Sequence, residues 1–131
     1  MKRTLKNYRL TFLWALFIFM MCTIKIGKIE QSSIFFPGFD KLVHCGFFLV
    51  LVVFFANDII RQHNYTFLPF KYAILVFVTA IIYGGSIELL QWLVFTWRDG
   101  DWNDLFADTI GAGMGMYSVL ITAAALNNDK K

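Results

Sequence analysis

The sequence predicts an all-α integral membrane protein with four transmembrane helices and both termini on the cytoplasmic side. Hydrophobic residues make up 58% of the 131 positions and charged residues only 16%, far from the composition of a soluble domain. A chain this short cannot bury 15 phenylalanines against itself, so lipid must cover much of its surface. The apolar residues also fall into four runs, and positive charges flank them, as membrane topology requires.

The first span is expected at about residues 9–26. Residues 1–9 carry four positive charges and no acid, and an apolar run follows. A signal peptide begins in the same way, but Met20 and Met21 are too bulky for a lipoprotein signal before Cys22, and no A-x-A pattern follows. We therefore expect a retained helix. Cys22 and Cys45 both lie in apolar runs, where each is most simply a small buried hydrophobic residue.

The remaining spans are expected at about residues 41–58, 70–97 and 104–126, within one membrane domain that covers residues 1–131. Each is long enough to cross a bilayer, for which about 20 residues suffice, with some tilt for the longest. The second span gives way to polar residues at Asn57 and Asp58. A charged turn with the sequence RDGDWND, residues 98–104, joins the third span to the fourth. No repeat and no soluble domain is visible.

The distribution of lysine and arginine predicts the orientation of these spans. With the N-terminus inside, the inner segments hold eight of these residues and the outer loops hold four. The inner ones are Lys2, Arg3, Lys6, Arg9, Arg61, Lys71, Lys130 and Lys131, and the outer ones are Lys25, Lys28, Lys41 and Arg98. The charged turn and the start of the second span then face the extracytoplasmic side.

Ionisable residues from three spans are expected at a similar shallow depth below that outer surface. At about 100° per helical residue, five residues of the last span and the turn before it fall within an arc of roughly 80°: Asp101, Asp104, Asp108, Gly111 and Gly115. Charged groups inside a bilayer usually face a bundle interior, so we predict a shared polar pocket. Its candidate residues are Asp40, Lys41, His44, Glu88, Gln91, Arg98, Asp101, Asp104 and Asp108. Gly84, Gly111 and Gly115 are candidates for close helix packing.

Part of this set also has ordinary structural interpretations. Asp40 is a natural N-cap for the second helix, and Lys41 and Arg98 could extend to lipid phosphates. Glu88 needs a partner inside the bilayer, and Arg98 or Lys41 would supply one. A purely structural ion network is therefore the alternative to a binding pocket.

Sequence motifs assign no metal site and no cofactor. The segment DGDWND begins like a calcium-binding loop, but Asp104 stands where glycine is needed and Ile110 where glutamate is needed. His44 and Cys45 are adjacent and too few to bind zinc. Carboxylates could still hold a divalent cation, Mg²⁺ or Ca²⁺, against a phosphate, so the cofactor is unknown. The chain also lacks the basic, aromatic stripe of a nucleic-acid-binding protein.

Three motifs in order resemble the VanZ-like family, small bacterial membrane proteins whose founding member is associated with resistance to the glycopeptide teicoplanin. They are DKLVH at residues 40–44, ELLQ at 88–91 and RDGDWNDLFADTIG at 98–111. The resemblance covers residues 39–115, and the first helix fits by position only. Nine positions match the family pattern: Asp40, Lys41, His44, Glu88, Gln91, Arg98, Asp101, Asp104 and Gly111. Asp108 departs from it, because the family usually has Asn there, and this changes the net charge expected of the pocket.

The resemblance implies a multi-pass protein of the bacterial cytoplasmic membrane. We expect a cell-envelope protein that contacts membrane lipid and whose pocket binds the head group of a lipid-linked precursor or a lipoglycopeptide. The mixed charges suit a zwitterionic or metal-bridged head group better than a bare anion.

Two other classes stay open. A membrane enzyme would use the carboxylates for acid–base work on a lipid phosphate or acyl group. A structural or assembly subunit would pack its glycine face against a partner or a second copy of itself.

Overall fold

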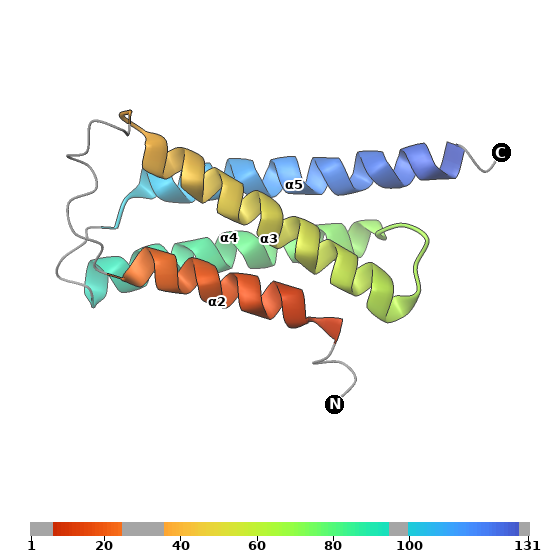
Figure 1. The fold of residues 1–131 in the computed structure, drawn as a ribbon, viewed down its shortest axis with the longest axis horizontal. Helices are drawn as coiled ribbons and strands as arrows, with labels where there is room; N and C mark the ends of the chain where they lie inside the picture. Colours follow the sequence, from red (N-terminus) through yellow and green to blue (C-terminus); the bar gives the residue numbers. More distant parts are fainter. Residues whose placement is uncertain (1–6, 25–35, 95–99, 129–131) are drawn as a thin grey trace.

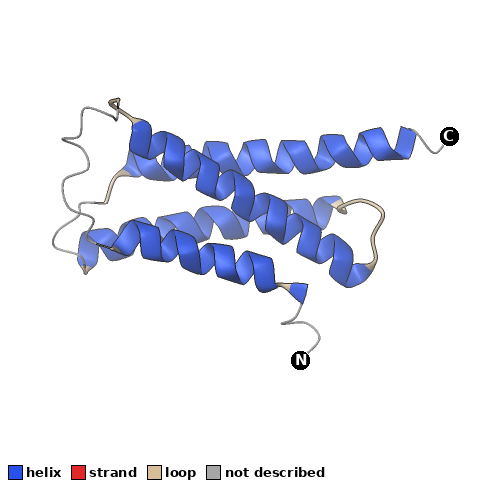
Figure 2. Cartoon of the chain, in the orientation of Figure 1, coloured by secondary structure: helices blue, strands red, loops and turns tan. Residues whose placement is uncertain are grey.

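The chain folds into a bundle of helices. The computed structural model describes residues 7–24, 36–94 and 100–128, and within these ranges it contains four α-helices and no strand (Figures 1 and 2). They are α2 (Arg9–Thr23), α3 (Phe39–His63), α4 (Phe70–Leu93) and α5 (Trp102–Asn128). The predicted all-helical class is confirmed.

Three of these helices are long and apolar enough to cross a membrane. Phe39–His63, Phe70–Leu93 and Trp102–Leu126 have mean hydropathies of 2.1, 2.1 and 1.5. Helix α2 is apolar but has 15 residues, so it is about 22 Å long at 1.5 Å per residue, less than the roughly 30 Å of a hydrocarbon core. The expectation of membrane-spanning helices therefore holds for α3, α4 and α5, whereas the span at α2 and the orientation stay predictions.

Helix α3 runs through the centre of the bundle and contacts the other three helices, with its largest interface on α5. The start of α3, the end of α4 and the start of α5 lie together at one end of the bundle, which we call the site end (Figure 1). The first turn of α2 and the last turn of α5 lie toward the opposite end.

Most buried apolar residues are small or aliphatic, with Phe48 as the largest fully buried side chain, and many bulky apolar residues lie on the outside. Val52, Ala56 and Ala112 are fully buried, whereas Phe70 and Trp92 are 79% and 71% exposed. Without a solvent-driven hydrophobic force between helices in lipid, close contact depends on small residues at the interfaces. The distribution therefore fits a bundle surrounded by lipid.

Two glycines allow α3 and α5 to touch through their backbones. A methyl group on Gly111 would lie 2.0 Å from the Cys45 carbonyl oxygen, and one on Gly115 would lie 2.5 Å from the Leu49 carbonyl oxygen. Neither distance leaves room for a Cβ atom, so any other residue would separate the helices. The glycine face thus packs against α3 within the same chain, which leaves little of it to bind a partner.

Helix α3 extends to His63, beyond the expected end of its span at residue 58. Asp58 therefore lies inside the helix, and its side chain is buried. Asp58 Oδ2 accepts hydrogen bonds from the Thr11 hydroxyl at 2.6 Å and from the Thr11 amide at 3.4 Å. Thr11 lies in the first turn of α2, where Tyr8 supplies no side-chain cap. The carboxylate therefore satisfies one backbone donor and one hydroxyl at the start of a neighbouring helix and anchors α2 to α3.

Candidate functional site

Lys41 joins the start of α3 to the start of α5. Its Nζ lies 2.9 Å from Asp101 Oδ2, 3.0 Å from Asp104 Oδ1 and 3.2 Å from Asp40 Oδ2. An ammonium group has three donors, and here each has a carboxylate acceptor. We refer to Asp40, Lys41, Asp101 and Asp104 as the lysine cluster.

Asp101 immediately precedes α5 and acts as its N-cap. Its Oδ1 accepts a hydrogen bond from the Asn103 backbone amide at 2.8 Å, which satisfies a donor in the first turn of the helix. Its Oδ2 accepts the bond from Lys41, and this bond is the main reason that the pKa of Asp101 lies below its usual value. One carboxylate therefore both starts α5 and binds α3 to it.

His44 lies one turn below Asp40, buried between two acids of α5. Its Nδ1 is 3.0 Å from Asp108 Oδ1, and its Nε2 is 3.8 Å from Asp104 Oδ2. His44, Asp104 and Asp108 are each at most 4% exposed. Asp108 has room beside α4 because the nearest residue there is Gly84, where a methyl group would lie 2.7 Å from Asp108 Oδ2.

Glu88 brings α4 to the same site. Its Oε2 accepts a hydrogen bond from the Asp101 backbone amide at 2.8 Å, while its Oε1 is buried with no hydrogen-bond partner among residues 7–24, 36–94 and 100–128. The loop can approach this turn of α4 because residue 100 is a glycine, whose Cβ position would lie 2.7 Å from the Glu88 carbonyl oxygen. The expected pairing of Glu88 with Lys41 is therefore replaced by a backbone contact, since Lys41 bonds the three aspartates.

Two predicted pocket residues fall outside this group. Gln91 is buried near the end of α4, where its Nε2 donates to the Cys22 carbonyl oxygen at 2.8 Å and so ties α4 to α2. Arg98 lies outside the described residues. The structure thus brings seven of the nine candidates into one region, where Asp40, Lys41, His44, Glu88, Asp101, Asp104 and Asp108 connect through α3, α4 and α5.

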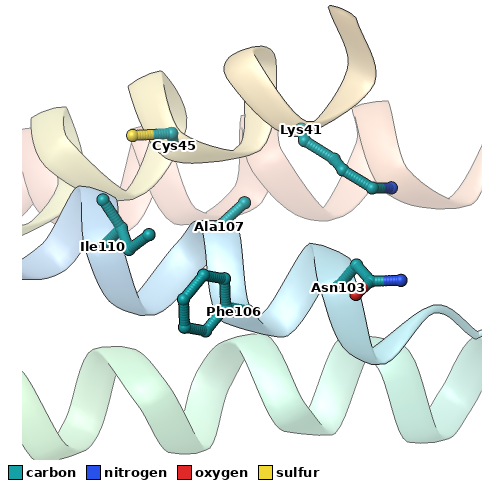
Figure 3. Close-up of a pocket in the computed structure, with 6 residues that line it drawn as sticks. All are labelled: Lys41, Cys45, Asn103, Phe106, Ala107 and Ile110. Atoms are coloured by element: carbon teal, nitrogen blue, oxygen red, sulfur yellow. The ribbon is translucent and has the colours of Figure 1, made fainter. Parts of the chain in front are cut away.

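A groove of about 320 Å³ lies beside the lysine cluster on the outer face of α3 and α5. Figure 3 shows Lys41 and Asn103 at one end, with Cys45, Phe106, Ala107 and Ile110 along the rest of it. Phe106 and Ile110 are 67% and 45% exposed, so the groove opens toward the surroundings of the bundle. The groove surface is mostly apolar, and the two polar residues that line it lie at one end.

The charge of the site is strongly unbalanced within the described part of the chain. Five carboxyl groups stand against one ammonium and one imidazole, so the acidic groups outnumber the basic ones by three. Uncompensated charge is costly at the edge of a bilayer. The arrangement is therefore suited to receive positive charge, either as an amine or as a metal ion.

Sequence reasoning missed Asp58 and Thr11, and it placed Gln91 in the pocket. Asp58 ends the apolar run of the expected second span, and it is buried where it meets Thr11 of α2. A signal that could have found the contact between Asp58 and Thr11 is present in the sequence. It is an acid on the second expected helix together with a hydroxyl in the first turn of the first expected helix, where no side chain caps the helix.

The family model described as VanZ/LLP1 matches residues 2–123 of the chain. No curated protein and no solved structure matches it.

Proposed function

This chain belongs to the VanZ/LLP1 family, and we propose that it is a cell-envelope protein that binds the head group of an amphiphile at the outer surface of a bacterial cytoplasmic membrane. In this proposal the site end faces the extracytoplasmic side, which follows from the excess of lysine and arginine in the opposite segments. The ligand is a lipid-linked precursor or a lipoglycopeptide such as teicoplanin, and its binding changes the access of such molecules to the cell surface.

The observation that carries this proposal is the groove beside the lysine cluster. Lys41 and Asn103 line one end of the groove, next to the carboxylates that their side chains bond, and its apolar floor is formed by residues such as Phe106 and Ile110. An amphiphile has the same division, with a polar head joined to a hydrocarbon chain. Ligand sites in general are mostly apolar with a few polar groups that fix orientation.

The lysine cluster also supports a zwitterionic head group. The side chains of Asp40 and Asp101 are 46% and 40% exposed, so a ligand amine can reach their carboxylates. The side chain of Lys41 is 36% exposed and can exchange an aspartate for a ligand phosphate or carboxylate. Each exchange replaces one charge-assisted hydrogen bond with another, which keeps the desolvation cost of binding small.

Blocking the groove tests this proposal directly. Ile110→Trp fills the floor of the groove without touching the lysine cluster, and we expect the purified protein to retain less lipid, measured by mass spectrometry of the detergent extract. Ile121→Trp is the matched control, because Ile121 lies on the same helix, is similarly exposed at 49% and does not line the groove. Equal lipid retention in both variants would contradict the groove as the binding site.

The antibiotic part of the proposal needs a test in cells. Cells that express the chain are exposed to teicoplanin and, as a control, to a glycopeptide that lacks the lipid tail. We expect protection against teicoplanin only, and we expect Lys41→Gln to remove it because this substitution breaks the link between the starts of α3 and α5. A Lys41→Gln protein that is expressed normally and protects as well as the parent would refute a role for the cluster.

A further inference from the structure

We propose that His44, Glu88 and Asp108 bind one divalent transition-metal ion, with zinc the preferred metal, at the centre of the site end. One ligand atom from each residue lies within 4.8 Å of the other two. All three side chains are buried, and each comes from a different helix. Zinc binding is independent of the proposed function, because it requires neither lipid nor antibiotic.

The distances fit a metal centre after a small adjustment. For three atoms that lie within 4.8 Å of one another, there is a point at most about 2.8 Å from each of them, where a metal ion could sit. Zinc bonds to nitrogen and oxygen are shorter, about 2.0–2.2 Å long. His44 Nδ1 and Asp108 Oδ1 are 3.0 Å apart, which is already close to the separation of two ligands on one zinc ion. A metal ion would replace the hydrogen bond between these two atoms, and the Glu88 ligand atom, which lies within 4.8 Å of the other two, would move toward the ion.

The free oxygen of Glu88 is the feature that points to a ligand. Within the described parts of the chain its Oε1 is buried without a hydrogen-bond partner, although Glu88 is only 4% exposed. Buried carboxylate oxygens without a partner are rare because their desolvation is not compensated. A cation bound between Glu88, His44 and Asp108 would satisfy this oxygen and offset the excess negative charge of the site.

The surroundings of the three ligands are also those of a metal site. If His44 binds the metal through Nδ1, its Nε2 faces Asp104 Oδ2 at 3.8 Å, and metal-binding histidines usually have a carboxylate or carbonyl on the second ring nitrogen. Gly84 provides the space for the Asp108 carboxylate, since a methyl group there would lie 2.7 Å from Asp108 Oδ2. The imidazole ligand favours zinc over Mg²⁺ or Ca²⁺, which prefer oxygen ligands.

Three protein ligands leave a fourth position on a tetrahedral ion open. Water fills it in the free protein. If the proposed function holds as well, a phosphate or carboxylate oxygen of the head group is the chemical class that would replace this water. That last step depends on the proposed function, whereas zinc binding itself does not.

The test uses the full chain purified in detergent through a tag without histidine, stripped with EDTA and dialysed against Zn²⁺. We expect one zinc ion per chain by elemental analysis in the parent, and near-complete loss in Glu88→Gln and in Asp108→Asn. Gly84→Ala changes no ligand but displaces Asp108, and we expect about 10- to 100-fold weaker binding. Asp58→Asn is the control, because it makes the same change at an equally buried acid of the opposite end and should bind zinc like the parent.

Zinc-edge X-ray absorption of the loaded parent decides the ligands even if a variant fails to fold. Nitrogen and oxygen neighbours with no sulfur support the site, whereas a sulfur neighbour would mean that Cys45 or Cys22 binds the ion and would overturn it. The proposal also fails if the parent retains no zinc. Equal zinc in the parent and in folded Glu88→Gln and Asp108→Asn would mean adventitious surface binding only. Since no lipid or antibiotic is added, failure here is distinct from failure of the head-group proposal.

Discussion

Replacing Gly111 with alanine should force α3 and α5 apart and destabilise the bundle. The new methyl group would lie 2.0 Å from the Cys45 carbonyl oxygen, and real Cβ contacts are essentially never shorter than 3.0 Å, so one helix must move by about 1 Å or more. The neighbour is backbone and cannot rotate away. Overpacking of a core typically costs about 1–3 kcal/mol, and we expect Gly111→Ala at the upper end of that range.

A glycine series on the same helix separates this contact from helix propensity. A methyl group on Gly113 would meet only Phe77, at 3.9 Å, so Gly113→Ala should be neutral or stabilise the helix by up to about 1 kcal/mol. Gly115→Ala should fall between the two, because its contact with the Leu49 carbonyl oxygen would be 2.5 Å. Thermal unfolding in detergent, followed by circular dichroism, measures the order. Equal melting temperatures for Gly111→Ala and Gly113→Ala would refute the backbone contact between α3 and α5.

Three further predictions concern orientation, burial and pH. In intact cells, an impermeant thiol reagent should label Asn103→Cys and leave His63→Cys unlabelled. The reverse pattern would mean that the topology is the opposite of the predicted one. Asp108→Asn should have a melting temperature close to that of the parent. Asp108→Leu should lower the free energy of unfolding by about 1–3 kcal/mol, because it leaves buried partners unsatisfied. Equal melting temperatures for the Asn and Leu variants would show that Asp108 faces solvent. Because the hydrogen bond from Lys41 lowers the pKa of Asp101, the stability that this pair contributes is present above the usual Asp value of 3.8 and is lost as the pH falls through the lowered pKa. The difference in melting temperature between the parent and Asp101→Asn should therefore shrink in strongly acidic buffer, and a constant difference would contradict the ion pair.

The helical class, and the side of α5 that packs against other helices, could be predicted because both depend on local rules. Apolar runs of sufficient length specify helices in lipid, where every backbone donor must be satisfied within the segment. The helical period then places Asp101, Asp104 and Asp108 on the same side as Gly111 and Gly115. Acids inside a bilayer need partners and glycines allow close approach, so both kinds of residue indicate a face that meets another helix.

The partners themselves could not be predicted, because they depend on how the helices are offset along one another. Lys41 was an expected partner of Glu88, yet it bonds the aspartates at the start of α5 instead. The Glu88 carboxylate is reached first by the Asp101 amide, and no residue pattern encodes a contact with backbone. The second span was expected to end at Asp58, where its apolar run gives way to polar residues. The burial of Asp58 depends on where the first turn of α2 meets α3.

Motif searches would not find the proposed zinc site, for the same reason. Such motifs search for ligands at fixed spacing on one helix or loop, whereas His44, Glu88 and Asp108 come from three helices and are separated by 44 and 20 positions. The signal in the sequence was weaker and more general, namely three ionisable residues at a similar depth in three different spans. That signal locates a site but does not say which atoms meet.

The glycine contacts and the acidic site depend on each other. Histidine and aspartate have short side chains, so His44 on α3 and Asp108 on α5 can come within 3.0 Å only where the two backbones approach closely. Gly111 lies one turn after Asp108 and provides that approach, because it removes the side chain that would otherwise stand against Cys45. Rigid helices, rather than loops, therefore set the distance between the two groups. It follows that a substitution which spreads α3 and α5 should weaken zinc binding at His44 as well as stability, although it changes no ligand.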